Sequence, residues 1–359
     1  MVGTLPSHKG HRTQQDPNHN ESSPTPNGDQ IPSGNQTNAN ARLLASSRLT
    51  SANWTDTDGH LHQFVFFQDV FSAIIARKWE SQNKTWVTSN LTSALTLSGS
   101  PLRPMSPSTP LASIASKFNS SAEVHLYFLT ENNGISGVAV HDLVNRPDTW
   151  QLDALGITTW PGSSLAAAWN RCWDFQCAGS YVVAYQRPDD AAIAVANSSD
   201  FSLSAVAVDL FGVAQGSSIG LIAEDVRLTM YTEFLVSQIS GRIQKTAYTQ
   251  GSWNILEQRF YLPPPSARVQ LVIGALPNND GIIFLALLPN GTLTGEFFRG
   301  SYVPIPIIRF QGGPPDVNFS AIATGEDAAF YGISNDTILQ YSINDSDPST
   351  FDFVETVYP

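Results

Sequence analysis

From residue 47 onward, short apolar runs alternate with turn-forming residues along the chain. Three typical runs cover residues 63–68, 124–129 and 181–186, where aromatic and β-branched residues recur with a period of two. Such runs, bounded by Gly, Pro, Asn or Asp, predict β-strands joined by turns. Helical periodicity is almost absent; residues 165–169 have helix propensity, but the corresponding segments elsewhere predict a strand. The pattern therefore predicts an all-β protein.

The aromatic strand recurs six times. Its equivalent positions lie 46 to 61 residues apart, at Phe67, Phe128, Tyr185, Tyr231, Phe284 and Tyr331. Each copy can be divided into a strand of small residues, the aromatic strand, and a turn with a third strand, as in 133–137 and 335–338. A period of about 50 residues in an all-β chain indicates a β-propeller with four strands per blade. We predict a six-bladed β-propeller of four-stranded antiparallel blades over residues 47–359. The small-residue strands should lie at the crowded axis, and no room remains for a separate catalytic domain.

The first 46 residues have a different composition, rich in Pro, Asn, Gln, Ser and Gly and almost free of apolar side chains. Such a segment cannot bury enough apolar surface to offset its ordering entropy, so residues 1–46 are expected to form a disordered polar arm or stalk. His8, His11 and His19 are too loosely spaced to indicate a metal-binding tract. The arm resembles the stalk of an ectodomain, whose membrane anchor would lie outside this chain.

Composition excludes several classes of protein. Only 14% of the residues are charged and the formal net charge is -12, so no basic stripe is available to neutralise phosphates and nucleic-acid binding is not expected. The longest apolar run, residues 281–288, is far shorter than the roughly 18 residues of a membrane-spanning helix. No signal peptide is visible in this chain.

The chain carries eleven Asn-X-Ser/Thr sequons where chance would give about four, and this motif is the acceptor of N-glycosylation. The excess predicts a secreted or cell-surface glycoprotein. Two of the sequons lie in the arm, and the others are at Asn53, Asn83, Asn90, Asn119, Asn197, Asn290, Asn318, Asn335 and Asn344. The two cysteines, Cys172 and Cys177, agree with an extracellular location because their close spacing favours a local disulfide. A metal pair or a redox pair is the alternative, but four residues separate the cysteines and no second pair exists.

The repeated motifs resemble those of the fungal fucose-specific lectins: a small-residue strand, an aromatic strand of the V-x-Y-Y-Q kind, an Asn-Gly-Ile turn and a terminal Trp. The resemblance covers the whole folded region, although each motif is short and degenerate. It implies a six-bladed propeller that binds fucosylated glycans between adjacent blades. In that family each pocket combines an Arg at the start of the aromatic strand, a Glu on the next strand and an aromatic ring from the neighbouring blade.

This chain departs from the family pattern at the polar positions. The Arg position corresponds to Phe64, His125, Val182 and Leu228 in the first four blades, with Arg227 one residue away. The Glu position corresponds to Gly137, Val195, Lys245, Gly295 and Gln340, with Glu296 one residue from it. Aromatic rings survive in part, at Trp86, Trp150 and Trp253. The resemblance therefore carries over the scaffold and not fucose binding. Two candidate carbohydrate-binding groups remain: His125 with Trp150, and Trp253 with Arg227 and Glu233.

The sequence does not contain the motifs of the enzyme classes that use this fold or similar chemistry. The Ser-x-Asp-x-Gly-x-Thr-Trp boxes of sialidases are absent, the carboxylates are scattered over the blades, and no Gly-x-Ser-x-Gly elbow accompanies the four histidines of the folded part. His60 and His62 share one strand face but lack a third metal ligand at definite spacing. The sequence therefore predicts a non-catalytic carbohydrate-binding propeller without cofactor or metal, whose partners are glycans, fucosylated ones included, or a surface protein. Two alternatives stay open: a glycoside hydrolase on a propeller, and a structural or protein-interaction propeller without sugar binding.

Overall fold

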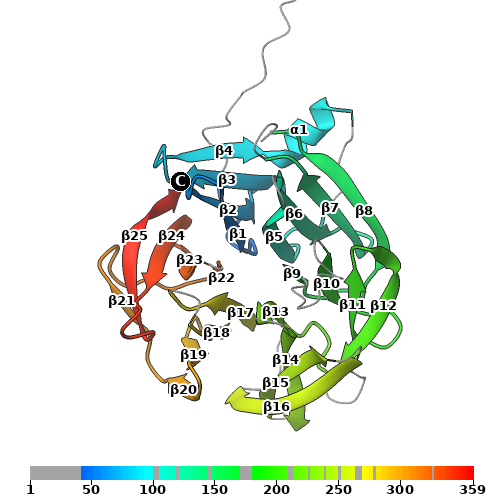
Figure 1. The fold of residues 1–359 in the computed structure, drawn as a ribbon, viewed down its shortest axis with the longest axis vertical. Helices are drawn as coiled ribbons and strands as arrows, with labels where there is room; N and C mark the ends of the chain where they lie inside the picture. Colours follow the sequence, from blue (N-terminus) through cyan, green and yellow to red (C-terminus); the bar gives the residue numbers. More distant parts are fainter. Residues whose placement is uncertain are drawn as a thin grey trace, which may run out of the picture. The chain divides into compact units, whose positions relative to one another are not determined.

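The chain forms a ring of six β-sheets (Figure 1). The structure, a computed structural model, describes residues 42–99, 105–118, 121–143, 148–169, 180–208, 213–224, 227–237, 240–249, 252–262, 269–277, 280–325 and 327–359. Five of the sheets have four strands and the sixth has five, so the predicted six-bladed β-propeller is confirmed. The sheets follow one another in chain order around the ring and are numbered here as blades 1 to 6.

Neighbouring strands of blades 1 to 3 are antiparallel. Blade 1 contains β1 (Thr50–Thr55), β2 (Leu61–Gln68), β3 (Ile74–Glu80) and β4 (Trp86–Asn90). Blade 2 contains β5 (Leu111–Phe118), β6 (Ser121–Leu129), β7 (Gly134–Val140) and β8 (Gln151–Thr158). Blade 3 contains β9 (Ala166–Trp169), β10 (Tyr181–Gln186), β11 (Ile193–Asn197) and β12 (Asp200–Val208). Residues with helix propensity at 165–169 thus form a strand in their greater part.

Blades 4 and 5 repeat this arrangement, and blade 6 adds a short parallel strand. Blade 4 contains β13 (Ile219–Glu224), β14 (Arg227–Ser237), β15 (Ser240–Thr249) and β16 (Ser252–Leu262). Blade 5 contains β17 (Gln270–Ala275), β18 (Ile282–Leu287), β19 (Leu293–Phe298) and β20 (Tyr302–Ile305). Blade 6 contains β22 (Ala321–Thr324), β23 (Ala329–Ser334), β24 (Thr337–Ile343) and β25 (Thr350–Tyr358), with β21 (Arg309–Gln311) beside β25.

One short helix, α1 (Leu91–Leu97), follows blade 1, and Asn90 caps it by accepting a hydrogen bond from the Ser93 backbone. Among the described residues no helix is long and apolar enough to span a membrane.

The first strand of each blade lines a central cavity of about 180 Å³. Adjacent first strands approach so closely that a Cβ on Gly220 would lie 2.6 Å from Ile273 Cδ1, and one on Gly274 would lie 2.8 Å from Thr324 Cβ. This crowding is the physical reason for the small residues that the sequence places in these strands.

Each junction between neighbouring blades holds its own apolar cluster, including the junction between blades 6 and 1. Successive residues of a strand belong to different clusters: Phe64 and Phe66 of β2 pack toward blade 2, while Val65 and Phe67 pack toward blade 6. Because both faces of a second strand are buried, its sequence is an almost continuous apolar run. Each large side chain buried this way contributes about 1.5–3 kcal/mol.

Buried glutamines link some blades at their edges. Gln68, at the end of β2, donates from Nε2 to the carbonyls of Ser72 (3.2 Å) and Ser106 (3.3 Å) and accepts from the Thr109 backbone N–H (3.0 Å). Gln186, at the end of β10, repeats the pattern with Ala191 O, Ala214 O and Gly216 N. In both cases two of the three partners lie in the loop that enters the next blade. The Gln of the V-x-Y-Y-Q motif is thus a structural link.

The N-terminal boundary of the propeller can be placed within the described residues. Leu43 is buried and forms a β-bridge with Asp69, and the Leu44 backbone donates to the Gln68 carbonyl. Contacts with blade 1 therefore begin ahead of Ser47, where the sequence predicts the arm to end. The predicted arm lies otherwise outside the described residues.

Candidate functional site

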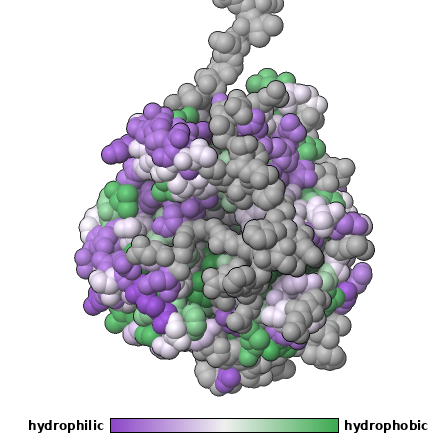
Figure 2. All heavy atoms as spheres, in the orientation of Figure 1, coloured by the Kyte–Doolittle hydropathy of each residue, from purple (hydrophilic) through white to green (hydrophobic). Residues whose placement is uncertain are grey.

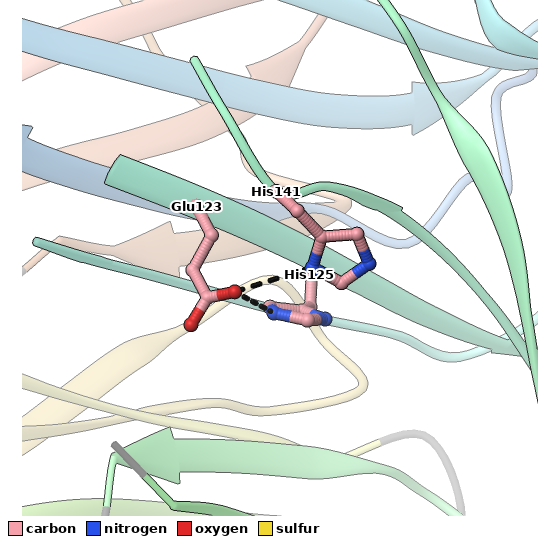
Figure 3. A group of neighbouring side chains, drawn as sticks. All are labelled: Glu123, His125 and His141. Atoms are coloured by element: carbon pink, nitrogen blue, oxygen red, sulfur yellow. Dashed lines mark hydrogen bonds and ion pairs between the residues drawn. The ribbon is translucent and has the colours of Figure 1, made fainter. Parts of the chain in front are cut away.

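The junction between blades 2 and 3 gathers titratable and aromatic side chains around His125, and Figure 3 shows Glu123 and His141 beside it. His125 lies on β6 at the Arg position of the lectin motif, with its side chain 1% exposed. Its ring lies 4.4 Å from the ring of Tyr181 on β10, which places it on the blade 3 side of its sheet. Phe201, at the start of β12, packs against Tyr181 at 5.9 Å. Blade 3 thus supplies the rings of Tyr181 and Phe201 to this junction.

Three side chains face one another on the outer side of this junction. His125 Nε2 lies 3.4 Å from Glu123 Oε2, and His141 Nδ1 lies 3.2 Å from the same oxygen. The exposed fraction of the side chain rises from 1% for His125 through 21% for Glu123 to 53% for His141. Glu123 and His125 are adjacent same-face positions of β6, and His141 follows β7, so strand pairing fixes their proximity.

A second carboxylate faces the other imidazole nitrogen. Asp153 Oδ2 lies 3.7 Å from His125 Nδ1 and accepts hydrogen bonds from the hydroxyls of Tyr127 (3.1 Å) and Tyr181 (3.4 Å). The His125 imidazole therefore lies between two carboxylates, Glu123 and Asp153, contributed by β6 and β8. The sequence prediction did not select Asp153 and His141, which come from other parts of the blade, or Glu123, although its position two residues before His125 on β6 was an available signal.

The charges of this junction shift each other's protonation. Burial alone would lower the pKa of His125, but interactions with Asp153 and Glu123 raise it above its ordinary value. Burial opposes ionisation of both carboxyl groups, yet His125 and its neighbours hold the pKa of Glu123 and of Asp153 below the ordinary range. Burial also raises the pKa of the Tyr127 hydroxyl, with Tyr181 and Asp153 adding to the effect. At neutral pH the two carboxylates are therefore ionised and Tyr127 remains a hydrogen-bond donor.

The predicted partners His125 and Trp150 do not meet. Trp150 packs edge-on against Phe64 and Phe66 of blade 1, at centroid distances of 6.1 and 6.0 Å. His125 points to blade 3, on the opposite side of the same sheet. The prediction that these two residues form one site is therefore wrong, because their side chains lie on opposite faces of the blade.

The junction between blades 1 and 2 is filled by its own side chains. Phe64 replaces the family Arg there and, with Trp54 and Phe66, belongs to the apolar cluster that includes Trp150. Both Phe64 and Trp150 are buried. Because these rings are buried, they are not available to stack on a sugar.

Two of the Glu positions cannot accept a side chain in this backbone. A Cβ on Gly137 would lie 2.7 Å from two ring carbons of Tyr127, and one on Gly295 would lie 2.4 Å from the carbonyl oxygen of Phe284. Tyr127 and the β18 backbone therefore occupy the space that a side chain would need. Steric crowding therefore explains why these positions have Gly and not Glu.

A cationic and aromatic group lies between blades 4 and 5. Lys245 of β15, at a Glu position, is buried and donates from Nζ to the hydroxyl of Tyr302 at 3.0 Å. The same Nζ lies 5.5 Å from the ring centroid of Tyr231, 5.8 Å from that of Phe298 and 5.7 Å from that of Tyr302. Tyr302 is the first residue of β20, the fourth strand of blade 5, and Trp253 is the second residue of β16, the fourth strand of blade 4. Tyr302 is therefore the aromatic ring that blade 5 contributes to its junction with blade 4. Sequence reasoning missed Tyr302 because it sought a Trp or Phe; the turn after Phe298 was the available signal.

The other predicted site residues are more scattered. Trp253 of β16 packs against the cluster between blades 3 and 4. Arg227 and Glu233 lie on β14, but their side chains are outside the described part of the structure. The predicted disulfide residues Cys172 and Cys177 and the sequon residue Asn119 also lie outside the described residues.

The described sequons occupy different environments. Asn53 lies on β1 and lines the central cavity. Asn83, Asn290, Asn318 and Asn335 are exposed, and Asn90, Asn197 and Asn344 are half-buried. Figure 2 shows hydrophilic side chains gathered over blades 1 and 6 on the viewed face.

Comparison with solved structures identifies proteins of the same fold. A mutant of Aleuria aurantia lectin in complex with alpha-methyl-L-fucoside is 17% identical in sequence, with a TM-score of 0.66, and the match covers 89% of this chain and 97% of the lectin. AofleA from Arthrobotrys oligospora is 17% identical with a TM-score of 0.63, covering 88% of both chains. A Trypanosoma rangeli sialidase is 11% identical with a TM-score of 0.51; the match covers 85% of this chain and 54% of the sialidase. No protein-family model and no curated protein matches this chain. At these identities the fold alone is shared, and the lectin-like propeller architecture expected from the sequence is confirmed.

Proposed function

We propose that this protein is a non-catalytic carbohydrate-binding propeller that contacts glycans between its blades. The observation that carries the proposal is the junction of blades 4 and 5, where a strand-three cation meets the aromatic ring of the next blade. This arrangement occurs on a fold shared, over nearly its whole length, with a lectin whose structure contains a bound fucoside.

The chemistry of Lys245 and Tyr302 suits a sugar. An aromatic ring offers a flat apolar surface to the C–H face of a pyranose, and a small number of placed polar groups fix the orientation of its hydroxyls. Tyr302 is half-buried, and its hydroxyl accepts a hydrogen bond from Lys245 Nζ. Because Lys245 stands where the fucose-specific family has Glu, the preferred sugar is expected to differ from fucose.

The carboxylates of the blade 2–3 junction do not favour a hydrolase. A glycosidase requires one protonated carboxyl group as general acid beside an ionised partner. Glu123 and Asp153 both have a lowered pKa, so both are ionised at neutral pH. The pair lacks the acid that glycoside hydrolysis needs.

An extracellular or cell-surface location is part of the proposal. Its support is the excess of sequons, four of which are exposed on the described propeller. Glycans of other molecules are the partners that such a location would present. A protein-interaction role without sugar binding is the alternative outcome of the test below.

A glycan array probed with the full chain tests the proposal. We expect binding to at least one glycan class and a loss of about tenfold or more in affinity, about 1.4 kcal/mol, for Tyr302→Ala. Tyr302→Phe keeps the ring and should retain most of the stacking contribution. The matched control is Phe71→Ala, which removes an aromatic ring that is 82% exposed and lies between β2 and β3 of blade 1. Absence of binding by the unmodified chain, or equal binding by Tyr302→Ala, would overturn the proposal.

A further inference from the structure

We propose that Glu123, His125 and His141 bind a divalent transition-metal ion such as Zn²⁺ at the outer side of the blade 2–3 junction. The inference is independent of carbohydrate binding, since it rests on a different junction and on a different chemistry. It also departs from the expectation from the sequence, which assigns no metal site to this protein.

The spacing of the three donor atoms fits one ion. Glu123 Oε2 lies 3.4 Å from His125 Nε2 and 3.2 Å from His141 Nδ1, and all three donor atoms lie within 4.8 Å of one another. Zinc–ligand bonds of about 2.0–2.2 Å in tetrahedral geometry place neighbouring donor atoms about 3.3 Å apart. The two distances from Glu123 Oε2 match this value, and Figure 3 shows both imidazoles within reach of that carboxylate oxygen.

The buried imidazole provides a second, independent observation. The His125 side chain is 1% exposed, and Nε2 is a buried nitrogen without a hydrogen-bond partner among the described residues. Its other nitrogen, Nδ1, faces the Tyr127 hydroxyl at 3.4 Å and Asp153 Oδ2 at 3.7 Å. Metal-binding histidines commonly have this arrangement, in which a carboxylate orients the ring and leaves the opposite nitrogen for the ion. Nε2 faces Glu123 Oε2 at 3.4 Å without forming a well-aligned hydrogen bond, and a metal ion between the two atoms would be bound by both.

The donor set indicates the class of ion. Two imidazole nitrogens and one carboxylate oxygen suit Zn²⁺, Co²⁺, Ni²⁺ and Cu²⁺, whereas Ca²⁺ and Mg²⁺ require more oxygen ligands. His141 is 53% exposed, so the ion can enter from solvent and keep one water ligand. Glu123 supplies a negative charge that offsets part of the charge of the ion.

Other histidines of the chain must be separated from this site. Asp56, Asp58 and His60 form a second described group within ligand distance, but Asp56 already accepts hydrogen bonds from two backbone N–H groups and contacts both His60 and His62. The arm adds His8, His11 and His19, which could bind metal weakly and without a fixed site.

The test uses the full chain without a histidine tag, carrying His8→Asn, His11→Asn, His19→Asn and His60→Asn as a common background. After treatment with a chelator, calorimetric titration with Zn²⁺ should show one equivalent bound per chain, and Co²⁺ should give the visible absorption of a four- or five-coordinate ion.

Glu123→Gln and His141→Asn, which alter partly exposed side chains, should each weaken Zn²⁺ binding about 100-fold or more. Asp153→Asn should weaken it about 10- to 100-fold through the orientation of His125. Thermal unfolding of each metal-free variant verifies that the propeller is intact. The proposal is overturned if the background protein binds no stoichiometric Zn²⁺, or if Glu123→Gln and His141→Asn bind as tightly as the background does.

Discussion

The Nε atom of Arg77 on β3 donates a 2.8 Å hydrogen bond to the carbonyl of Val357 on β25, and so joins the first blade to the last. The guanidinium also lies 5.7 Å from the ring centroid of Tyr358, which packs on Phe67 at 4.8 Å. Blades 1 and 6 each come from one continuous stretch of chain, so side chains rather than an exchanged strand close the ring.

Replacement of Arg77 should therefore weaken the contact between blades 1 and 6 and destabilise the fold. Arg77→Met keeps part of the apolar stem but removes the hydrogen bonds to Val357 and to Thr88. We expect a loss of about 1.5–3 kcal/mol in the free energy of unfolding, measured by denaturant titration. Arg309→Met is the matched control, because Arg309 is 59% exposed and forms a surface ion pair with Asp347. Its effect should stay below about 1 kcal/mol; equal losses for both variants would contradict the closing role of Arg77.

The glutamine links make a second stability prediction. Gln186→Met retains the volume of the side chain but leaves the Gly216 N–H and two carbonyls without this partner. Because an unsatisfied buried polar group costs about 1–3 kcal/mol, the free energy of unfolding should fall by about 3 kcal/mol. The exposed Gln82, changed to Met, serves as the control and should alter stability by less than about 0.5 kcal/mol. A small effect of Gln186→Met would show that the link is dispensable.

Gly137, at the Glu position of blade 2, predicts that the family pocket cannot be restored by one substitution. Gly137→Ala places a Cβ against the Tyr127 ring, and overpacking of this kind costs about 1–3 kcal/mol. Gly137→Glu should destabilise further and confer no fucose binding, as measured by thermal unfolding and by titration with methyl fucoside. Gly59→Ala lies in an open turn with nothing within 4 Å, so its cost should come only from its positive φ of 85°. Fucose binding by a stable Gly137→Glu variant would refute this account.

Asp327 and Asp347 should affect the pH dependence of stability in opposite directions. Burial raises the pKa of Asp327, which contacts Gln63, above the ordinary value of 3.8. The folded state therefore holds a proton that the unfolded state releases as pH rises above 3.8, and the stability of the unmodified protein falls through that window. Asp327→Asn should raise the unfolding temperature at pH 7, and its advantage should disappear as the pH falls toward 3.8.

Asp347 provides the opposite case as a control. Hydrogen bonds from Ser349 and Thr350 lower its pKa to about 2. Its contribution to stability is present above pH 3.8 and is lost as the pH falls toward 2, so Asp347→Asn should destabilise at pH 7 and have little effect at pH 2. Unfolding temperatures of the three proteins across this range measure both effects. Shifts of the same sign for the two variants would contradict the assigned environments.

The sequons differ in accessibility, which predicts site-specific glycosylation. In protein secreted by a eukaryotic host, peptide mapping should find glycans at the exposed Asn290 and Asn335. Asn53 should be unmodified in folded protein, because a glycan does not fit in the central cavity that it lines. Glycan-free Asn290 and Asn335 would argue against the extracellular proposal, and a glycan at Asn53 would contradict the position of β1.

The sequence alone determined the strands, their number per repeat and the six blades. Period-two apolar patterns and turn residues are local signals, and they located β2, β6 and β10 within a few residues. Left-handed backbone at Asn133 and Asn335 likewise follows from local turn chemistry, as their φ angles of 57° and 50° show.

Only the tertiary structure decided which side chains share a site. Neighbouring residues on a propeller strand face different blades, so the partner of His125 is Tyr181 of the next blade and not Trp150 of its own. His141 and Asp153 reach His125 through strand register, which sequence spacing does not encode, whereas Glu123 lies two residues before it on β6. A repeat is a local property of the chain, whereas a junction between repeats is made by residues dozens of positions apart, and the ring that brings them together sets the chemistry there.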